Sequence, residues 1–337
     1  MAENRLKVQY DTFDVFQNDN PGYVNKSGKR MYLDPFNITI EISKSKLYKT
    51  GTSIFRPTVP QIQPNPKIQV VDGDCLKHAL KLKSEGHNPI VLNMANAEVP
   101  GGGYLYGSGA QEENLFRRTN LYQYHESNKD QWYPIPLLGG IYCPNATVIK
   151  ASEQEGYELL EKPETMSFVA VAAIAHPYLV EHNNKPTLNE EDQEITRNKI
   201  RTMLNIGLDN GHDAIVLSAF GCGAFANPPS TIAQLFYEVI SKEYSGGKEN
   251  LPKTYKNISF AIFDDSSARQ WENGEGNLLP FKKRFANGIS STESVKQEFQ
   301  DFEIFILLSR NFIVYIPFQD NQKLGFLQLS VTTKLQK

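Results

Sequence analysis

The chain carries, at residues 93–119, the sequence NMANAEVPGGGYLYGSGAQEENLFRRT. The apolar run 90–92 precedes this stretch and is typical of a buried strand. Five glycines then fall within the nine residues 101–109. Only glycine adopts a positive φ and lets the backbone approach a neighbour closely without a Cβ clash. We therefore expect a strand followed by a loop whose N–H groups can surround an anion.

Two carboxylates, Glu112 and Glu113, follow this loop, and the apolar residues after them have roughly helical spacing. The pattern predicts a helix whose first turn holds both acids, where negative charge is favoured. Neighbouring residues of a helix diverge by about 100°, so we expect the two side chains to point apart. Glycine-rich turns and acidic helix starts are each common structural features. Their junction favours a site that holds an anionic ligand beside a proton donor.

The triplet Gly101-Gly102-Gly103, seven further residues and then Gln111-Glu112-Glu113 resemble the signature of poly(ADP-ribose) glycohydrolases. The likeness is nearer to the microbial-type branch, a compact macrodomain-like form, and extends over roughly residues 10–286. It implies a macrodomain-like, three-layer α/β/α fold with a mixed central sheet. It also implies hydrolysis of the ribose–ribose bonds of poly(ADP-ribose) to ADP-ribose, which reverses ADP-ribosylation, as in the DNA damage response.

Three regions are expected along the chain. Residues 1–66 form an N-terminal extension that ends in a proline-rich connector. In the family a similar piece packs over the substrate pocket, and a simple leader arm is the alternative. Residues 67–287 form the catalytic core. Residues 288–337 form a tail of open role, in which the apolar runs 302–308 and 312–318 predict two strands or a helix and a strand.

The remaining elements follow from apolar patterns and turn residues. The run 168–174 is continuously apolar and predicts a strand covered on both faces. A short helix is expected to begin at 11–16. Further strands are expected at 30–33, 67–72, 139–144, 146–149, 213–220 and 258–263, with 139–144 and 146–149 paired to each other, and helices at 189–210, before Gly211, and at 230–245.

Asp74 follows the strand 67–72 and directly precedes a helical pattern, so it is a predicted N-cap. In macrodomains an aspartate at this place contacts the adenine amino group. Asp74 therefore caps the helix, binds adenine, or does both. The resemblance also puts Phe263 where relatives stack an aromatic ring on adenine, and packing in the core is the alternative.

A second glycine-rich loop reads GCGAFANPP at residues 221–229 and lies between a predicted strand and a predicted helix. A glycine loop at a helix N-terminus favours anion binding. The sequence resembles the second phosphate loop of the same family. Two such loops would bracket one diphosphate at the carboxyl edge of a sheet. The predicted substrate contacts in this loop are Gly221, Cys222, Gly223, Ala224 and Phe225, with the Cys222 side chain expected to be small and buried.

The resemblance implies a role for each polar residue of the first motif. Glu113 would be the general acid that protonates the leaving ribose oxygen, and then the base that activates water. Glu112 would orient a ribose hydroxyl, while Gln111 and Asn96 would add hydrogen bonds. Gly101, Gly102 and Gly103 would bind the substrate by their backbone. A dry site would have to raise the pKa of the acid toward neutrality.

Composition sets limits on partners and cofactors. The 337 residues are 40% hydrophobic and 22% charged with a net charge of −3, which argues against a general nucleic-acid binder. Three widely spaced cysteines and six histidines show no disulfide framework or metal spacing, so we expect no metal and no cofactor. Without a signal peptide or a membrane span in the sequence, we expect an intracellular monomer, cytoplasmic or nuclear.

Two rival functions stay open at this point. One is a hydrolase that removes single ADP-ribose units from proteins. The other is a catalytically silent ADP-ribose reader. The presence of both Glu112 and Glu113 argues against the reader, whereas nothing in the sequence excludes the mono-ADP-ribosyl hydrolase.

Overall fold

The computed structural model describes residues 1–54, 56–264, 268 and 276–289, and the backbone of 313–320 and 323–330. The chain divides into two compact units, Met1–Ser291 and Thr292–Lys337. In the second unit, β14 (Ile313–Asp320) and β15 (Lys323–Ser330) form an antiparallel hairpin. The predicted run 302–308 lies outside the described residues, and 312–318 overlaps β14.

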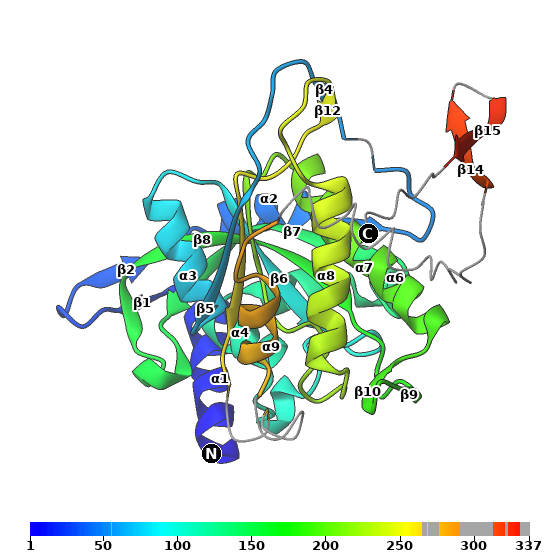
Figure 1. Cartoon of the computed structure of the whole chain (residues 1–337). Helices are drawn as coiled ribbons and strands as arrows, with labels where there is room; N and C mark the ends of the chain where they lie inside the picture. Colours follow the sequence, from blue (N-terminus) through cyan, green and yellow to red (C-terminus); the bar gives the residue numbers. More distant parts are fainter. Residues whose placement is uncertain (55, 265–267, 269–275, 290–312, 321–322, 331–337) are drawn as a thin grey trace. The chain divides into compact units, whose positions relative to one another are not determined.

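A mixed sheet forms the centre of the first unit (Figure 1). Its first two pairings are antiparallel and its other four are parallel, so five consecutive strands end at the same edge. The predicted mixed sheet is confirmed. In spatial order the seven strands are β3 (Lys46–Tyr48), β7 (Gly140–Lys150), β8 (Leu159–Ala172), β6 (Pro89–Ala95), β11 (Ala214–Leu217), β13 (Asn257–Ile262) and β5 (Lys67–Asp72).

Helices cover both faces of this sheet, which confirms the predicted three layers (Figure 1). One face carries α7 (Glu190–Asp209), α8 (Pro229–Glu243) and α9 (Leu278–Arg284). The other face carries α1 (Ala2–Gln17), α2 (Pro35–Ser43), α3 (Cys75–Ser84), α4 (Gln111–Arg118), α5 (Leu121–Glu126) and α6 (Lys129–Trp132). Among the described residues, no helix combines the length and the apolar character needed to cross a membrane.

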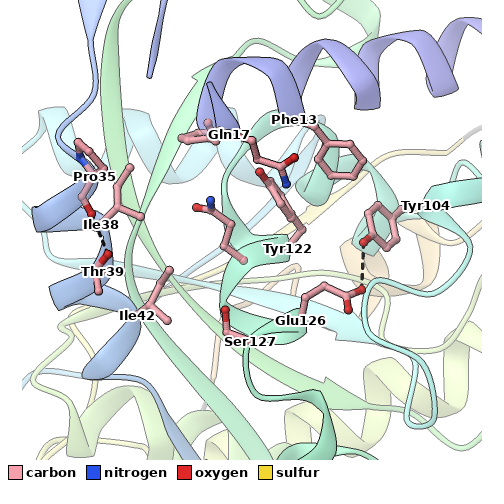
Figure 2. A pocket seen from close by; sticks show the side chains of 12 residues that line it. Phe13, Gln17, Pro35, Ile38, Thr39, Ile42, Tyr104, Tyr122, Glu126 and Ser127 are labelled. Carbon is pink, nitrogen blue, oxygen red and sulfur yellow. Dashed lines mark hydrogen bonds between the residues drawn. The ribbon is translucent and has the colours of Figure 1, made fainter. Parts of the chain in front are cut away.

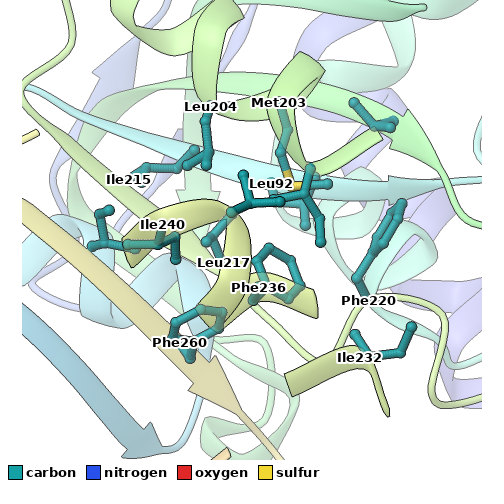
Figure 3. Packing of buried hydrophobic residues seen from close by; sticks show 14 of the residues in the cluster. Leu92, Met203, Leu204, Ile215, Leu217, Phe220, Ile232, Phe236, Ile240 and Phe260 are labelled. Carbon is teal, nitrogen blue, oxygen red and sulfur yellow. The ribbon is translucent and has the colours of Figure 1, made fainter. Parts of the chain in front are cut away.

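The strands are apolar throughout because successive side chains enter different cores. Ile90 and Leu92 pack with α7 and α8, whereas Val91 between them packs with α3 and α4. Phe168 and Val169 divide in the same way on β8. Figure 3 shows the first of these cores, where side chains of α7 and α8 meet those of the sheet. Each fully buried side chain of this size contributes about 1.5–3 kcal/mol of hydrophobic stabilisation.

Side-chain caps begin two of the predicted helices. The Asp74 carboxylate accepts a hydrogen bond from the Lys77 N–H at 2.7 Å and starts α3, which confirms the predicted N-cap. Asn189 accepts one from the Asp192 N–H at 2.9 Å and starts α7. Gly211, with φ of 81°, follows the end of α7 as predicted.

The pairing predicted between 139–144 and 146–149 is wrong, because both runs belong to the single strand β7. Its register with β8 shifts between Cys143 and Ala146, where Asn145 adopts a φ of 45°. In the sequence, Pro144 and Asn145 are typical of a turn. In the structure they form a bulge that kinks a continuing strand. The strand predicted at 213–220 is also too long, because β11 ends at Leu217 and the chain then leaves the sheet.

The N-terminal segment contacts the sheet and the helices of the first unit. Thr12 Oγ1 donates a hydrogen bond to the Arg117 carbonyl at 2.5 Å, and Lys150 Nζ donates one to the Val8 carbonyl at 2.7 Å. α1 is longer than the short helix predicted at 11–16. The described part of this unit also contains three two-stranded pairs: β1 (Gly22–Val24) with β2 (Arg30–Tyr32), β4 (Thr58–Val59) with β12 (Leu251–Pro252), and β9 (Leu179–His182) with β10 (Lys185–Leu188).

Candidate active site

The two glycine loops lie at the same edge of the sheet. β6 and β11 are parallel neighbours, with Ile90 paired to Ile215, so the loops that follow them leave the sheet side by side. The loop after β8 joins them, since the His176 N–H donates to the Phe225 carbonyl at 2.9 Å. The carboxyl edge of parallel strands is where α/β proteins of this kind bind ligands.

The first loop brings Glu112 and Glu113 together over Gly102, which has a φ of 55°. A Cβ on Gly102 would lie 2.7 Å from Glu113 Oε1 and 3.3 Å from Glu112 Oε2. The expectation that the two side chains point apart is therefore wrong for their carboxylates. Helix geometry separates the Cβ atoms, but glutamate is long enough to reach back to the same point of the preceding loop.

Glu113 has one fixed oxygen and one without a partner. Its Oε1 accepts a hydrogen bond from the Gly103 N–H at 2.9 Å. Its Oε2 is buried and has no hydrogen-bond partner among the described residues. The residue is 7% exposed. A carboxyl group held in this way is oriented by one oxygen, while the other is not engaged by the described residues.

Glu112 is held by two donors at the end of β6. Its Oε2 accepts from the Asn96 N–H at 2.8 Å, and its Oε1 accepts from Asn93 Nδ2 at 3.2 Å. Burial raises the pKa of Glu112 to about 8, and the charge of Glu113 also raises it, whereas the donors oppose the shift. Glu112 therefore keeps its proton to a higher pH than an exposed glutamate does.

Gln111 holds the start of α4 to β6, and Asn96 shapes the turn that follows β6. The Gln111 side chain accepts from the Met94 N–H at 2.9 Å and donates to the Leu92 carbonyl, so both ends of its amide engage β6. Asn96 Oδ1 accepts from the Glu98 and Val99 N–H groups at 2.8 and 3.0 Å. In the structure these side chains shape the loop, and their predicted contacts with substrate stay predictions.

Asp74 does more than cap α3. Arg118, with only 2% of its side chain exposed, forms a two-pronged ion pair with the Asp74 carboxylate at 2.7 and 2.9 Å. A paired arginine–carboxylate contact fixes the orientation of both groups. Asp74 therefore stands at the end of β5 in one defined geometry, and its contact with adenine stays a prediction.

The second loop is closed by Asn227, which the sequence analysis does not assign to the site. Asn227 is 1% exposed, and its Nδ2 donates to the carbonyls of Ile174, Gly221 and Phe225 at 2.7, 3.1 and 3.3 Å. Gly221 has a φ of 74°, and a Cβ there would lie 2.6 Å from Asn227 Nδ2. The signal in the sequence is the asparagine directly before two prolines.

The other residues predicted for this loop differ in how far they are exposed to solvent. Cys222 is fully buried, as predicted, and burial raises the pKa of its thiol well above the ordinary value. Cys222 is thus packed inside the loop, and its predicted contact with substrate stays a prediction. Gly223 and Ala224 are exposed, and a Cβ on Gly223 would meet nothing within 4 Å. Phe263, which directly follows β13, is 51% exposed, so packing in the core does not explain it.

Two further residues hold the first loop and are not among the residues predicted for the site. Asn93 holds Glu112, and Arg117 Nη1 donates to the Ser108 carbonyl at 2.8 Å. Arg117 is fully buried, and its Nε donates to the Tyr157 hydroxyl at 3.0 Å. The sequence indicates these two roles only weakly, because a polar residue in an apolar strand or in the last turn of a helix has many possible roles.

A cavity of about 390 Å³ lies next to this site but does not contain the predicted residues. Figure 2 shows its lining side chains, which come from α1, α2, α5 and the short helix η1 (Tyr104–Tyr106). Tyr104, which directly follows Gly103 in the first loop, lines the cavity and donates a hydrogen bond to Glu126 at 3.0 Å. The predicted site lies instead at the sheet edge, around Glu112 and Glu113. The sequence predicts a first loop that surrounds an anion with its N–H groups, but Gly102 donates to the Val99 carbonyl at 3.0 Å and Gly103 to Glu113 at 2.9 Å, so these two N–H groups are engaged within the protein.

Comparison with known proteins bears on both the fold and the motifs. Residues 11–151 match the family described as microbial-type PARG, catalytic domain, where PARG stands for poly(ADP-ribose) glycohydrolase. This segment includes the first glycine loop and both glutamates. The resemblance predicted from the sequence is therefore confirmed over this segment. No curated protein matches the chain.

Solved structures share the fold over most of the chain. The poly(ADP-ribose) glycohydrolase of Thermomonospora curvata is 23% identical, with a TM-score of 0.64, 84% of this chain covered and 100% of that chain. The same protein bound to the inhibitor ADP-HPD gives a TM-score of 0.62. The Deinococcus radiodurans glycohydrolase in complex with ADP-ribose is 18% identical, with a TM-score of 0.55, 76% of this chain covered and 99% of that chain.

Proposed function

We propose that this protein is a poly(ADP-ribose) glycohydrolase that hydrolyses ribose–ribose O-glycosidic bonds and releases ADP-ribose. One observation carries the proposal. Within the segment that matches the microbial-type family, Glu113 has one oxygen held by the Gly103 N–H and the other buried without a partner. The carboxyl group is thus oriented for proton transfer. The second glycine loop and the N-terminus of α8, which are suited to bind an anion, follow the neighbouring strand β11.

The order of the strands supports a linear placement of ADP-ribose. Glu113 follows β6, the second glycine loop follows β11, and Phe263 and Asp74 follow β13 and β5. We place the terminal ribose beside Glu113, the diphosphate on the backbone of the two glycine loops, and the adenine between Phe263 and Asp74. Gly101, Gly102 and Gly103 contribute on one side, and residues 221–225 on the other. The N-terminus of α8 adds a favourable dipole for the diphosphate.

The reaction follows from this placement. Glu113 donates its proton to the oxygen of the leaving ribose, and the bond between that oxygen and the anomeric carbon breaks with its electron pair on the oxygen. The diphosphate of the bound unit stabilises the resulting oxocarbenium ion. The Glu113 carboxylate then takes a proton from water, whose oxygen adds to the anomeric carbon. The products are ADP-ribose and the shortened polymer, and Glu113 is again protonated. Glu112 orients a ribose hydroxyl.

The direct test is incubation with labelled poly(ADP-ribose), read for free ADP-ribose. Release of ADP-ribose supports the proposal. Turnover of protein-linked single ADP-ribose without turnover of the polymer would favour the mono-ADP-ribosyl hydrolase, and binding without any turnover would favour the reader. ADP-ribose at a hundredfold excess over its Kd should also stabilise the fold by about 2.7 kcal/mol. An unchanged Tm at millimolar ADP-ribose would contradict the assigned pocket.

We further propose that the protein acts as a monomer on poly(ADP-ribose) or ADP-ribosylated proteins, without a metal, a cofactor or direct nucleic-acid binding. Its place would be the cytoplasm or the nucleus, where it would reverse ADP-ribosylation after DNA damage. Gel filtration with light scattering tests the oligomeric state. Activity in the presence of a chelator tests the independence from metal ions.

A further inference from the structure

We propose that Tyr106 is a stacking platform for the adenine of the ADP-ribose unit on the leaving side of the bond that is cut. This inference rests on the proposed function and deepens it, because it names a residue that favours the polymer over single ADP-ribose. Tyr106 would contact the part of the substrate that leaves, whereas the two glycine loops hold the part that stays.

The two tyrosines of η1 have opposite environments. Tyr104 is 4% exposed and packs on Phe116 at a ring centroid distance of 5.1 Å. Tyr106, two residues later, is 81% exposed. Among the described residues, none stacks on the Tyr106 ring or forms a hydrogen bond with its hydroxyl. Leu105 between them is 48% exposed and extends the apolar surface. One face of this short helix is thus buried, and the other presents an aromatic ring to solvent.

The backbone that carries Tyr106 is rigid. The Tyr106 and Ser108 N–H groups both donate to the Gly103 carbonyl, at 2.9 and 3.2 Å. Arg117 holds the Ser108 carbonyl from behind. Gly107 packs so closely on α1 that a Cβ there would lie 2.6 Å from the Ala2 carbonyl oxygen. A ring on a fixed backbone loses little conformational entropy when a ligand stacks on it.

The position of Tyr106 suits the leaving group. Gly103 donates its N–H to Glu113 and accepts the Tyr106 N–H, so the acid and the ring are joined through one residue. The 3₁₀ helix η1 has three residues, and a helix of this kind and length rises about 6 Å. In the proposed reaction the oxygen that Glu113 protonates belongs to a ribose that also carries an adenine. That adenine must therefore lie close to Glu113, and η1, which carries Tyr106, begins directly after the Gly103 that holds this acid.

Stacking also matches the charge of the surroundings. Residues 97–110 contain no lysine, arginine or histidine, and Arg5, which lies against Gly109, is paired with Glu153 at 2.8 Å. Base–aromatic stacking contributes about 1–3 kcal/mol per base. A single ADP-ribose on a protein has no adenine on its leaving side, so only the polymer would gain this contact.

The test compares initial rates on poly(ADP-ribose) for the wild type, Tyr106→Ala and Tyr106→Phe. Tyr106→Ala should raise KM about five- to hundredfold with little change in kcat, because it removes binding common to ground and transition states. Tyr106→Phe keeps the ring and should behave like the wild type. Tyr32→Ala, which removes a tyrosine that is 66% exposed on β2, is the matched control and should leave KM unchanged.

Calorimetric titration with ADP-ribose separates this inference from its alternatives. Tyr106→Ala should bind ADP-ribose as the wild type does, because the retained unit does not contact the ring. An unchanged KM, a Tyr106→Phe variant as weak as Tyr106→Ala, or an equal loss of ADP-ribose affinity would each overturn the platform while the glycohydrolase activity stands. A wild type that cleaves no polymer would instead overturn the proposed function, and this inference with it.

Discussion

The two glycine loops look alike in the sequence but use glycine for different reasons. At Gly102 the missing side chain makes room for protein groups, since a Cβ would meet Glu113 and Glu112. At Gly223 it leaves space that no described atom occupies within 4 Å. The first loop is held by a buried carboxylate pair, and the second by the neutral amide of Asn227. We infer that the first loop serves the chemistry and the second serves ligand binding.

The sharpest test of this division is Glu113→Gln. The amide keeps the shape of the side chain but cannot deliver a proton. We expect hydrolysis of the polymer to fall by at least about a hundred- to ten-thousandfold, the usual contribution of general acid–base catalysis, while ADP-ribose affinity stays within about tenfold. Single-turnover rates and calorimetric titration measure the two effects. Cleavage at the wild-type rate would mean that another carboxylate is the acid.

A matched pair of glycine substitutions compares the loops directly. Gly102→Val places a Cβ against Glu113 at a φ of 55°, and kcat should fall about a hundredfold because the acid is displaced. Gly223→Val meets open space, so its melting temperature should stay at the wild-type value. Its ADP-ribose affinity should fall about tenfold, the equivalent of one lost hydrogen bond to a charged group. If both substitutions change kcat to the same extent, the proposed difference between the two loops is wrong.

The carboxylate pair also predicts a pH dependence. The pKa of Glu112 rises from an ordinary value of 4.5 to about 8 in the folded protein. Its protonated form therefore stabilises the fold fully at pH values below 4.5, and this stabilisation is lost as the pH rises through 8. Glu112→Gln stays neutral, so its free energy of unfolding relative to the wild type should increase from pH 5 to pH 9. The gain should be of the order of 4 kcal/mol, since about three pH units separate pH 5 from a pKa of about 8 and each corresponds to about 1.4 kcal/mol. Denaturant unfolding across this range measures it, and a difference that does not vary with pH would contradict the buried pair.

The last comparison concerns the side chain that closes the second loop. Asn227→Ala removes one donor from three carbonyls and should lower the free energy of unfolding by about 1–3 kcal/mol, together with ADP-ribose affinity. Asn128→Ala is the control, since its side chain donates to the Tyr124 carbonyl, away from the glycine loops. If Asn227→Ala changes stability but leaves ADP-ribose affinity intact, this asparagine supports the fold and not the ligand site.

Local signals predicted most of the architecture. The apolar runs at β6, β8 and β13 are buried strands because their side chains face two cores. Asp74 and Asn189 begin helices through hydrogen bonds that span three residues. The motif around Gly102 and the two glutamates indicated the family, because the spacing of glycines and acids within a short stretch is visible without any tertiary contact.

What the sequence determined by itself was therefore local: the strands, the caps, the glycine loops and the residues able to do acid–base chemistry. Only the tertiary structure decided how they meet. The bulge in β7 looks like a turn until the long partner β8 pairs with both of its halves. The carboxylates converge because the loop before α4 folds back on them. Gln111, Asn93 and Asn227 act through partners that depend on strand order, and hydrogen bonds between separate segments leave no periodic trace in the sequence.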